Sequence, residues 1–169
     1  ERNGLLRLGV AALPDLSALT LQVFRLPTET FKSLAHLRPT LRHVAITRCR
    51  GPGSIATLGA FSWLRTLKLH NAPEVTAAQL YGLFAQLPAL VEFDGQNLPA
   101  VKSDFKAFVA AAPRCLRRLR LVLVHDLVSR PLEPLAQLPL LEGLWLSGFP
   151  HHSTEQLLPL ADSFHLRSL

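Results

Sequence analysis

The stretch "LRTLKLHNAP" at residues 64–73 places three leucines, Leu64, Leu67 and Leu69, among polar residues. Leu67 and Leu69 are separated by one residue, Lys68, which is the alternation of a strand with one buried face. The segment is therefore predicted to be a short strand. Whether it is a single strand or one copy of a repeat decides the fold.

The same spacing recurs along the chain. Further copies begin at Leu16, Leu41, Leu90, Leu116, Leu141 and Leu166. The copy at Leu90 is degenerate, because Gly95 takes the place of the third apolar residue. Including Leu64, successive starts are separated by 25, 23, 26, 26, 25 and 25 residues. A regular period within roughly 20 to 29 residues is typical of a leucine-rich-repeat solenoid.

The second half of most copies predicts a helix. Helix starts are indicated by two capping boxes and by Ser residues in N-cap or first-turn positions, namely Thr76 with Gln79, Ser153 with Gln156, Ser54, Ser103 and Ser129. Apolar residues at helical spacing form three predicted core faces: Phe31, Leu34 and Leu37; Leu80, Leu83, Phe84 and Leu87; Phe105, Phe108 and Val109. Most strands are preceded by a proline, at Pro14, Pro39, Pro88, Pro113 and Pro139. Proline ends a helix and favours extended backbone before it, but the copy at Leu64 has "FSW" instead.

The chain is similar to the leucine-rich-repeat family, whose motif is Leu-x-x-Leu-x-Leu-x-x-Asn/Cys, over essentially all of its 169 residues. Its repeat length and helices most resemble the cysteine-containing and ribonuclease-inhibitor-like subclasses. The resemblance implies an α/β solenoid, curved, with parallel strands on the concave face and true helices on the convex face. Cys49 alone occupies the Asn/Cys place, and the other copies carry Phe24, Ala72, Leu98, Val124 and Phe149 there. No asparagine ladder is therefore expected.

Residues 1–169 are predicted to form a single leucine-rich-repeat domain. We expect it to be part of a longer chain, because "LRSL" at its end is a strand without the polar capping repeat that a solenoid needs. No apolar run is long enough to cross a bilayer. Cys49 and Cys115 lie in different repeats, so a disulfide between them is not expected and an intracellular, cytoplasmic location is favoured.

Geometry predicts a concave inner face. Parallel strands stack at about 4.8 Å, whereas neighbouring helices need about 8 to 10 Å, so the stack must curve with its strands inside. Residues between the core leucines project onto this face. Their basic members are Arg42, Arg48, Arg65, Lys68, Arg117, Arg118, Arg120 and Arg167, and their acidic members are Glu92, Asp94 and Glu142. Eight basic residues against three acids place nearly all of the chain's net charge of +6 on this face.

Two interpretations of these charges stay open. In the first, charge keeps an exposed sheet soluble, with a cross-strand ladder of Lys68, Asp94 and Arg120 and a pair between Glu92 and Arg118. Each cross-strand pair would then contribute a few tenths of a kcal/mol.

In the second interpretation the inner face binds a partner. Arg42, Arg65 and Arg117 have no adjacent acid in their own row, which favours carboxylates or phosphates of a ligand. Trp145, next to Arg120 and the apolar Val122 and Leu123, has the character of a binding hot spot. Its alternative role is packing under a terminal loop or a further repeat. The predicted partner-binding residues are Arg42, Arg65, Lys68, Arg117, Arg118, Arg120 and Trp145.

The predicted function is a scaffold for protein–protein interaction that binds an acidic partner, as part of a larger assembly. One alternative is a ribonucleoprotein or nucleic-acid-associated component, because phosphates would satisfy the same arginines. Another is the substrate-recognition module of a ubiquitin ligase, which the repeat length resembles, although these residues contain no F-box.

An enzyme is not predicted, and no cofactor, metal or small-molecule substrate is expected. The seven histidines show no metal-binding spacing, and the pair His151 and His152 is interpreted as a solvated loop. The segment "RGPGS" at 50–54 lacks the Lys-Ser/Thr ending of a phosphate loop. Cys49 lies between two arginines, which lower a thiol's pKa, but its place in the repeat indicates a packed turn residue.

Overall fold

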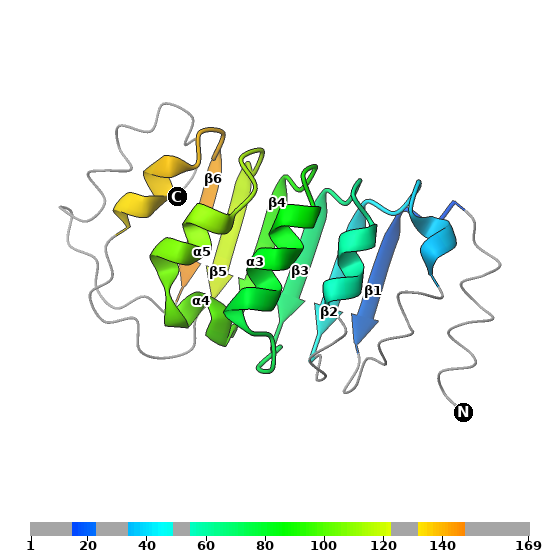
Figure 1. Cartoon of the computed structure of the whole chain (residues 1–169), viewed down its shortest axis with the longest axis horizontal. Coiled ribbons are helices and arrows are strands. Elements are labelled where there is room, and N and C mark those ends of the chain that lie inside the picture. Colours follow the sequence, from blue (N-terminus) through cyan, green and yellow to red (C-terminus); the bar gives the residue numbers. More distant parts are fainter. Residues whose placement is uncertain (1–14, 23–33, 49–54, 123–131, 148–169) are drawn as a thin grey trace.

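The computed structural model describes residues 15–22, 34–48, 55–122 and 132–147. Within these ranges each intact or degenerate copy contributes one strand of five residues: β1 (Ala18–Gln22), β2 (His43–Thr47), β3 (Thr66–His70), β4 (Glu92–Gln96), β5 (Arg118–Val122) and β6 (Gly143–Ser147). The strands form one parallel sheet in the order β1-β2-β3-β4-β5-β6 (Figure 1). The predicted stack of parallel strands is confirmed.

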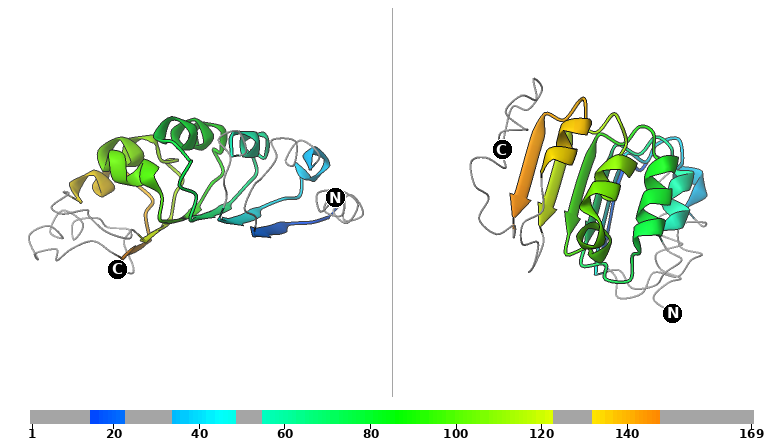
Figure 2. Two further views of the ribbon diagram at one scale, coloured as in Figure 1. Left: turned by 90° about the horizontal axis from the view of Figure 1, so that it is seen from below. Right: turned by 60° about the vertical axis from the view of Figure 1, so that its left-hand side comes forward.

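The connections carry helices on one side of the sheet. They are the α-helices α3 (Ala77–Gln86), α4 (Pro99–Ser103) and α5 (Phe105–Ala111) and the 3₁₀ helices η1 (Ala35–Leu37), η2 (Ala56–Ala60) and η3 (Glu133–Gln137). Figure 2 shows these helices along the outer side of the curve and the strands along its inner side. None of the described helices is both long enough and apolar enough to cross a membrane.

The prediction of true helices is wrong for the described parts of three copies, where η1, η2 and η3 are 3₁₀ helices. For η2 the length of the copy gives a reason. This helix lies in the shortest copy, with 23 residues between Leu41 and Leu64. A 3₁₀ helix rises about 2.0 Å per residue against about 1.5 Å for an α-helix, so it spans the same distance with fewer residues.

The repeated apolar positions form one continuous core. The register places Val44, Leu67, Phe93, Leu119 and Leu144 side by side, and all five are at most 3% exposed. The predicted helix faces also point inward, with Leu80, Leu83, Phe84, Leu87, Phe105, Phe108 and Val109 buried. Of the first predicted face, Leu34 and Leu37 are buried, and Phe31 lies outside the described residues. Leucine spacing thus fixes both layers of the fold.

The degenerate copy has a packing explanation. The ring of Phe93 lies 5.1 Å from the ring of Phe84 and 5.9 Å from that of Phe108, measured between centroids. A Cβ atom on Gly95 would lie 2.9 Å from Cε1 of Phe93 and 3.1 Å from Cδ1 of Leu98. Phe93 therefore fills the volume that two leucines share in the other copies, and Gly95 leaves room for it.

Helix α3 begins where the capping box predicts. The amide of Gln79 donates to Oγ1 of Thr76 at 3.3 Å, and the amide of Thr76 donates to Oε1 of Gln79 at 2.9 Å. The prediction of Ser103 as an N-cap is wrong. Asp104 caps α5, its Oδ1 accepting from the amide of Ala107 at 2.9 Å, whereas the Ser103 hydroxyl donates back to the carbonyl of Ala100 in α4.

The other predicted helix starts, Ser54, Ser129 and Ser153, lie outside the described residues.

The backbone at the carboxyl ends of the strands turns sharply. Arg48, Asn71 and Asn97 have φ angles of 59°, 53° and 52°, a left-handed conformation that asparagine tolerates better than most residues. Nδ2 of Asn97 donates to Oδ1 of Asn71 at 3.2 Å. This pair lies one position ahead of the motif's Asn/Cys place, where Ala72 and Leu98 are buried. The polar contact between neighbouring turns is thus made outside the core.

Candidate partner-binding surface

The inner face is the side of the sheet opposite the helices. It carries the first, third and fifth residues of the strands, because side chains alternate along a strand. On β3 to β6 these positions include Thr66, Lys68, His70, Glu92, Asp94, Gln96, Arg118, Arg120 and Trp145. Register places Lys68, Asp94, Arg120 and Trp145 in one row across these four strands.

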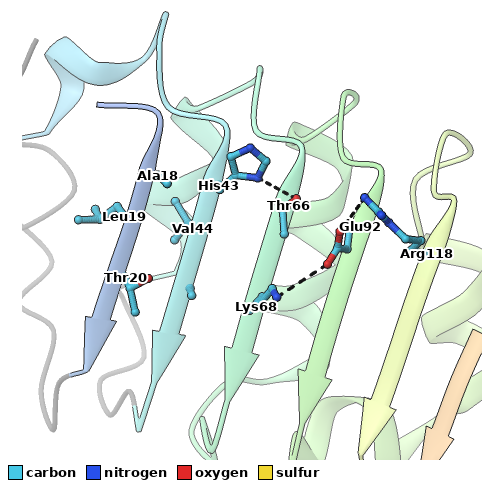
Figure 3. Close-up of a pocket in the computed structure, with 10 residues that line it drawn as sticks. Ala18, Leu19, Thr20, His43, Val44, Thr66, Lys68, Glu92 and Arg118 are labelled. Atoms are coloured by element: carbon cyan, nitrogen blue, oxygen red, sulfur yellow. Dashed lines mark hydrogen bonds and ion pairs between the residues drawn. The ribbon is translucent and has the colours of Figure 1, made fainter. Parts of the chain in front are cut away.

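Glu92 lies between two basic side chains. Its Oε2 is 3.0 Å from Nη2 of Arg118, and its Oε1 is 3.9 Å from Nζ of Lys68 (Figure 3). The predicted pair of Glu92 and Arg118 is confirmed. The predicted ladder is wrong in one member, because the Lys68 ammonium pairs diagonally with Glu92 and not with Asp94 opposite it.

Asp94 is 4% exposed and is surrounded by donors and positive charge. Its Oδ2 lies 3.2 Å from Nε2 of His70 and 3.8 Å from Nη1 of Arg120, and its Oδ1 accepts from Nε2 of Gln96 at 3.3 Å. Burial raises the pKa of Asp94, but His70, Gln96 and Arg120 outweigh burial and hold this pKa below its usual value. Asp94 is therefore ionised at neutral pH.

Sequence reasoning missed His70 and Gln96 as partners of Asp94. The repeat spacing could have shown that these side chains are neighbours, because it places His70 and Gln96 directly opposite each other on β3 and β4. Gln96 also lies two residues from Asp94 on one face of β4, within reach of its carboxylate.

Arg117 corrects another prediction. It was expected to have no acidic neighbour, yet its Nη1 forms an ion pair with Oε1 of Glu142. The amide of Glu142 donates to the carbonyl of Arg117 at 2.8 Å, so the two residues are adjacent in the row ahead of the strands. Among the described residues, no carboxylate lies within ion-pair distance of Arg42 or Arg65.

Trp145 projects from β6 with 58% of its surface exposed. The guanidinium carbon of Arg120 lies 5.5 Å from the centroid of its ring, which is within cation–π range. Of its two other expected neighbours, Val122 is half-buried and Leu123 lies outside the described residues. Trp145 and Arg120 border a hollow of about 380 Å³, whose lining also includes Phe93, Leu119 and Leu144.

A second hollow, of about 350 Å³, lies over the first strands (Figure 3). Over these strands the residues that line the hollow are mostly small and uncharged, and they include Ala18, Thr20, Val44 and Ala45. Lys68, Glu92 and Arg118 line both hollows. The inner face thus carries no carboxylate, lysine or arginine on β1 and β2, and its charged side chains lie on β3 to β5.

The inner face and the row ahead of the strands together remain basic. In the described part of the chain these two regions carry six basic side chains, Arg42, Arg65, Lys68, Arg117, Arg118 and Arg120, against Glu92, Asp94 and Glu142. Arg48 lies in the turn after β2, and Arg167 lies outside the described residues. Each of the three carboxylates has a basic partner, and the two regions have a surplus of three positive charges.

In the described ranges, no group of three or more His, Cys, Asp or Glu residues is arranged to hold a metal ion. Cys115 contacts backbone, its Sγ lying 2.9 Å from the carbonyl oxygen of Pro88 and 3.1 Å from that of Leu90. His43 is hydrogen-bonded through Nδ1 to Oγ1 of Thr66 at 3.0 Å. Cys49, His151 and His152 lie outside the described residues.

The six parallel strands lie in sequence order, with the helices on the outer side of the sheet. Five of the six strands belong to copies that keep the spacing of Leu-x-x-Leu-x-Leu. This arrangement defines a leucine-rich-repeat solenoid. Solved structures of this fold are similar to the chain. They include internalin C2 of Listeria monocytogenes, with a TM-score of 0.51 and 16% identity over 95% of this chain and 83% of that one. The tropomodulin C-terminal domain of Caenorhabditis elegans gives a TM-score of 0.53 and 13% identity over 96% and 91%.

A further internalin of Listeria monocytogenes, inlF, gives a TM-score of 0.50 and 15% identity over 81% of this chain, which spans 36% of that protein. At these identities the likeness establishes the fold alone, and the expected subclass stays a prediction. No protein-family model matches the sequence, and no curated protein sequence matches it.

Proposed function

We propose that this leucine-rich-repeat domain is a non-enzymatic scaffold that binds an acidic segment of a partner protein on its inner face, as part of a larger assembly. The observation that carries the proposal is Trp145, an exposed tryptophan that borders a hollow and is covered by an arginine. The binding set is the predicted one: Arg42, Arg65, Lys68, Arg117, Arg118, Arg120 and Trp145.

The composition of the hollow beside Trp145 favours a protein ligand. Tryptophan and arginine are the residue types that most often form hot spots at protein interfaces. The exposed Trp145 ring provides an apolar surface at this hollow, and Arg118 and Arg120 are exposed beside it. An extended acidic segment with one apolar side chain matches both features.

The internal ion pairs support an acidic ligand as well. Glu92 and Asp94 are each flanked by positive charge, so they do not present free negative charge to an approaching carboxylate. Long-range attraction by the basic surplus also raises the association rate of an acidic partner.

The test compares wild type with Trp145→Ala in binding a fluorescein-labelled, glutamate-rich peptide that carries one phenylalanine. We expect Trp145→Ala to weaken binding by about 2 kcal/mol or more, roughly thirtyfold in Kd, because the ring is the apolar contact. Thermal unfolding should be unchanged, since the side chain is 58% exposed. Equal affinity of the two proteins would exclude Trp145 as the anchor.

A nucleic-acid ligand is the competing function, and the basic surplus is the observation that favours it. Within the described strands, however, Trp145 is the only aromatic side chain exposed on the inner face, and one ring does not build a stacking platform. Changing Arg117, Arg118 and Arg120 to Glu separates the two functions in a gel-shift with single-stranded oligonucleotide. A shift that is steeply salt-dependent and lost in this variant would favour nucleic acid.

A further inference from the structure

Trp63 is exposed because of the backbone that holds it. The amide of Leu64 donates to the carbonyl of Phe61 at 2.9 Å, which closes a tight turn with Ser62 and Trp63 at its tip. Phe61 and Leu64 are both 0% exposed, so the two ends of the turn are fixed in the core. The tip must then face solvent, and Trp63 is 61% exposed.

The fold does not require tryptophan at this tip. The copy at Leu90 makes an equivalent turn, in which the amide of Leu90 donates to the carbonyl of Leu87 at 3.1 Å. Its tip carries Pro88 and Ala89. A small side chain thus suffices at the position of Trp63, so this kind of turn does not itself require a large ring there.

One arginine side chain lies against this ring, and a second arginine is adjacent to the first in the row ahead of the strands. The guanidinium carbon of Arg42 lies 6.0 Å from the centroid of the Trp63 ring. The amide of Arg65 donates to the carbonyl of Arg42 at 2.7 Å, so the two arginines are adjacent. In the described part of the chain neither arginine has a carboxylate within ion-pair distance, whereas Arg117, in the same row, pairs with Glu142.

We propose that Arg42, Trp63 and Arg65 form a second docking site, at the amino-terminal rim of the sheet, for an acidic peptide segment of a protein partner. Arg42 and Arg65 belong to the predicted binding set, but none of the three residues lines either hollow of the inner face, so this site is distinct from the hollow beside Trp145. We call these three residues the Trp63 rim site.

Charge complementarity selects this occupant. Within the described ranges the two arginines have no carboxylate at ion-pair distance and so attract negative charge, and the exposed Trp63 ring beside Arg42 offers an apolar contact. A second copy of the same rim would oppose like charges, which disfavours self-association through this site. A peptide with carboxylates on either side of one apolar residue makes both contacts.

The experiment uses the chain's two tryptophans as separate reporters, since Trp63 and Trp145 are the only ones present. Trp145→Phe leaves emission from Trp63 alone, and Trp63→Phe leaves emission from Trp145 alone. Each protein is titrated with the glutamate-rich peptide that carries one phenylalanine, at about 0.15 M salt to screen long-range attraction. We expect a saturable blue shift of Trp63 emission in the Trp145→Phe protein, because the bound peptide removes water from the ring.

Two charge reversals of equal size serve as the test and its control, both made in the Trp145→Phe protein. Arg42→Glu with Arg65→Glu should weaken the Trp63 response about tenfold or more, since it replaces both attractive charges by repulsive ones. Arg118→Glu with Arg120→Glu changes the net charge equally on the inner face and should leave that response within about twofold. Thermal unfolding checks that each variant is folded.

The outcomes separate the two sites. A Trp63 response lost only with the rim pair supports the Trp63 rim site, whatever happens to the Trp145 reporter on the inner face. The absence of a Trp63 response, or an equal loss with both pairs, overturns it. A Trp63 response to single-stranded oligonucleotide but not to the peptide also overturns the assignment of an acidic peptide.

Discussion

Gly95 provides the most direct test of the packing in β4. In Gly95→Ala, the new Cβ would lie 2.9 Å from Cε1 of Phe93, closer than carbon atoms pack without a shift. The Phe93 ring cannot move away freely, because it is 0% exposed and packs against the rings of Phe84 and Phe108. The added methyl must therefore strain the core.

The cost follows from two opposing terms. Overpacking a core costs about 1 to 3 kcal/mol. Replacing glycine by alanine within a strand returns roughly 0.5 to 1 kcal/mol of backbone entropy and propensity. The net loss from these ranges is at most about 2.5 kcal/mol, and their midpoints give about 1.3 kcal/mol, or a decrease of about 3 to 5 °C in Tm for a domain of this size.

The assay is equilibrium unfolding in urea, followed by far-ultraviolet circular dichroism, on a double-mutant cycle of Phe93→Leu and Gly95→Ala. Leucine lacks the ring atoms that meet the new Cβ, so Gly95→Ala should cost little or nothing in the Phe93→Leu protein. The interaction energy should be at least about 1 kcal/mol, which is typical of residues in contact.

Gly82→Ala is the matched control. A Cβ on Gly82 in α3 would meet no atom within 4 Å, so this change should stabilise the protein by up to about 1 kcal/mol. If Gly95→Ala costs the same in the wild-type protein and in the Phe93→Leu protein, the explanation of the degenerate copy by ring volume is wrong.

Two further predictions concern acid and helix stability. Because the pKa of Asp94 is lowered by folding, its contribution to the free energy of unfolding is present above about pH 4 and is lost as pH falls through the folded-state value. Asp94→Asn should therefore be less stable than wild type at pH 7, and the difference in urea midpoint should shrink on acidification; a difference independent of pH would refute this. Thr76→Ala removes the acceptor for the Gln79 amide and should cost about 1 kcal/mol in thermal unfolding, whereas Thr76→Ser should cost little. An equal loss in both variants would show that the hydroxyl is not the cap.

The layers of the fold were predictable because the leucine spacing specifies both period and direction. Leu67 and Leu69 could be placed in the core and Lys68 on the opposite face from alternation alone, and the structure has them so. The capping box at Thr76 was equally local, since its two partners are three residues apart. Of the predicted helix starts within the described residues, Ser103 is the one that failed, because the carboxylate of neighbouring Asp104 is the stronger acceptor.

The ion pairs were less predictable, because strand register fixes which residues are opposite each other but not where a long side chain ends. The Lys68 side chain is long enough to form its ion pair with Glu92 on the diagonal instead of with Asp94 directly opposite. The Asp94 carboxylate already lies between His70 and Arg120. The pair of Arg117 and Glu142 is a different case. Both occupy one row and their adjacency follows from the repeat, so the pair could have been found from the sequence.

The row of residues directly ahead of the strands is held in place by main-chain hydrogen bonds. From Ser17 to Glu142 its members are joined by successive main-chain hydrogen bonds of 2.7 to 2.9 Å, independent of what their side chains are. Side chains there are consequently displayed on a scaffold with a constant step of about 4.8 Å. Under the proposed function, substituting one of these side chains changes a single contact with the partner without altering the spacing of the others, so partner preference can drift in evolution, or be changed by design, while the solenoid beneath stays intact.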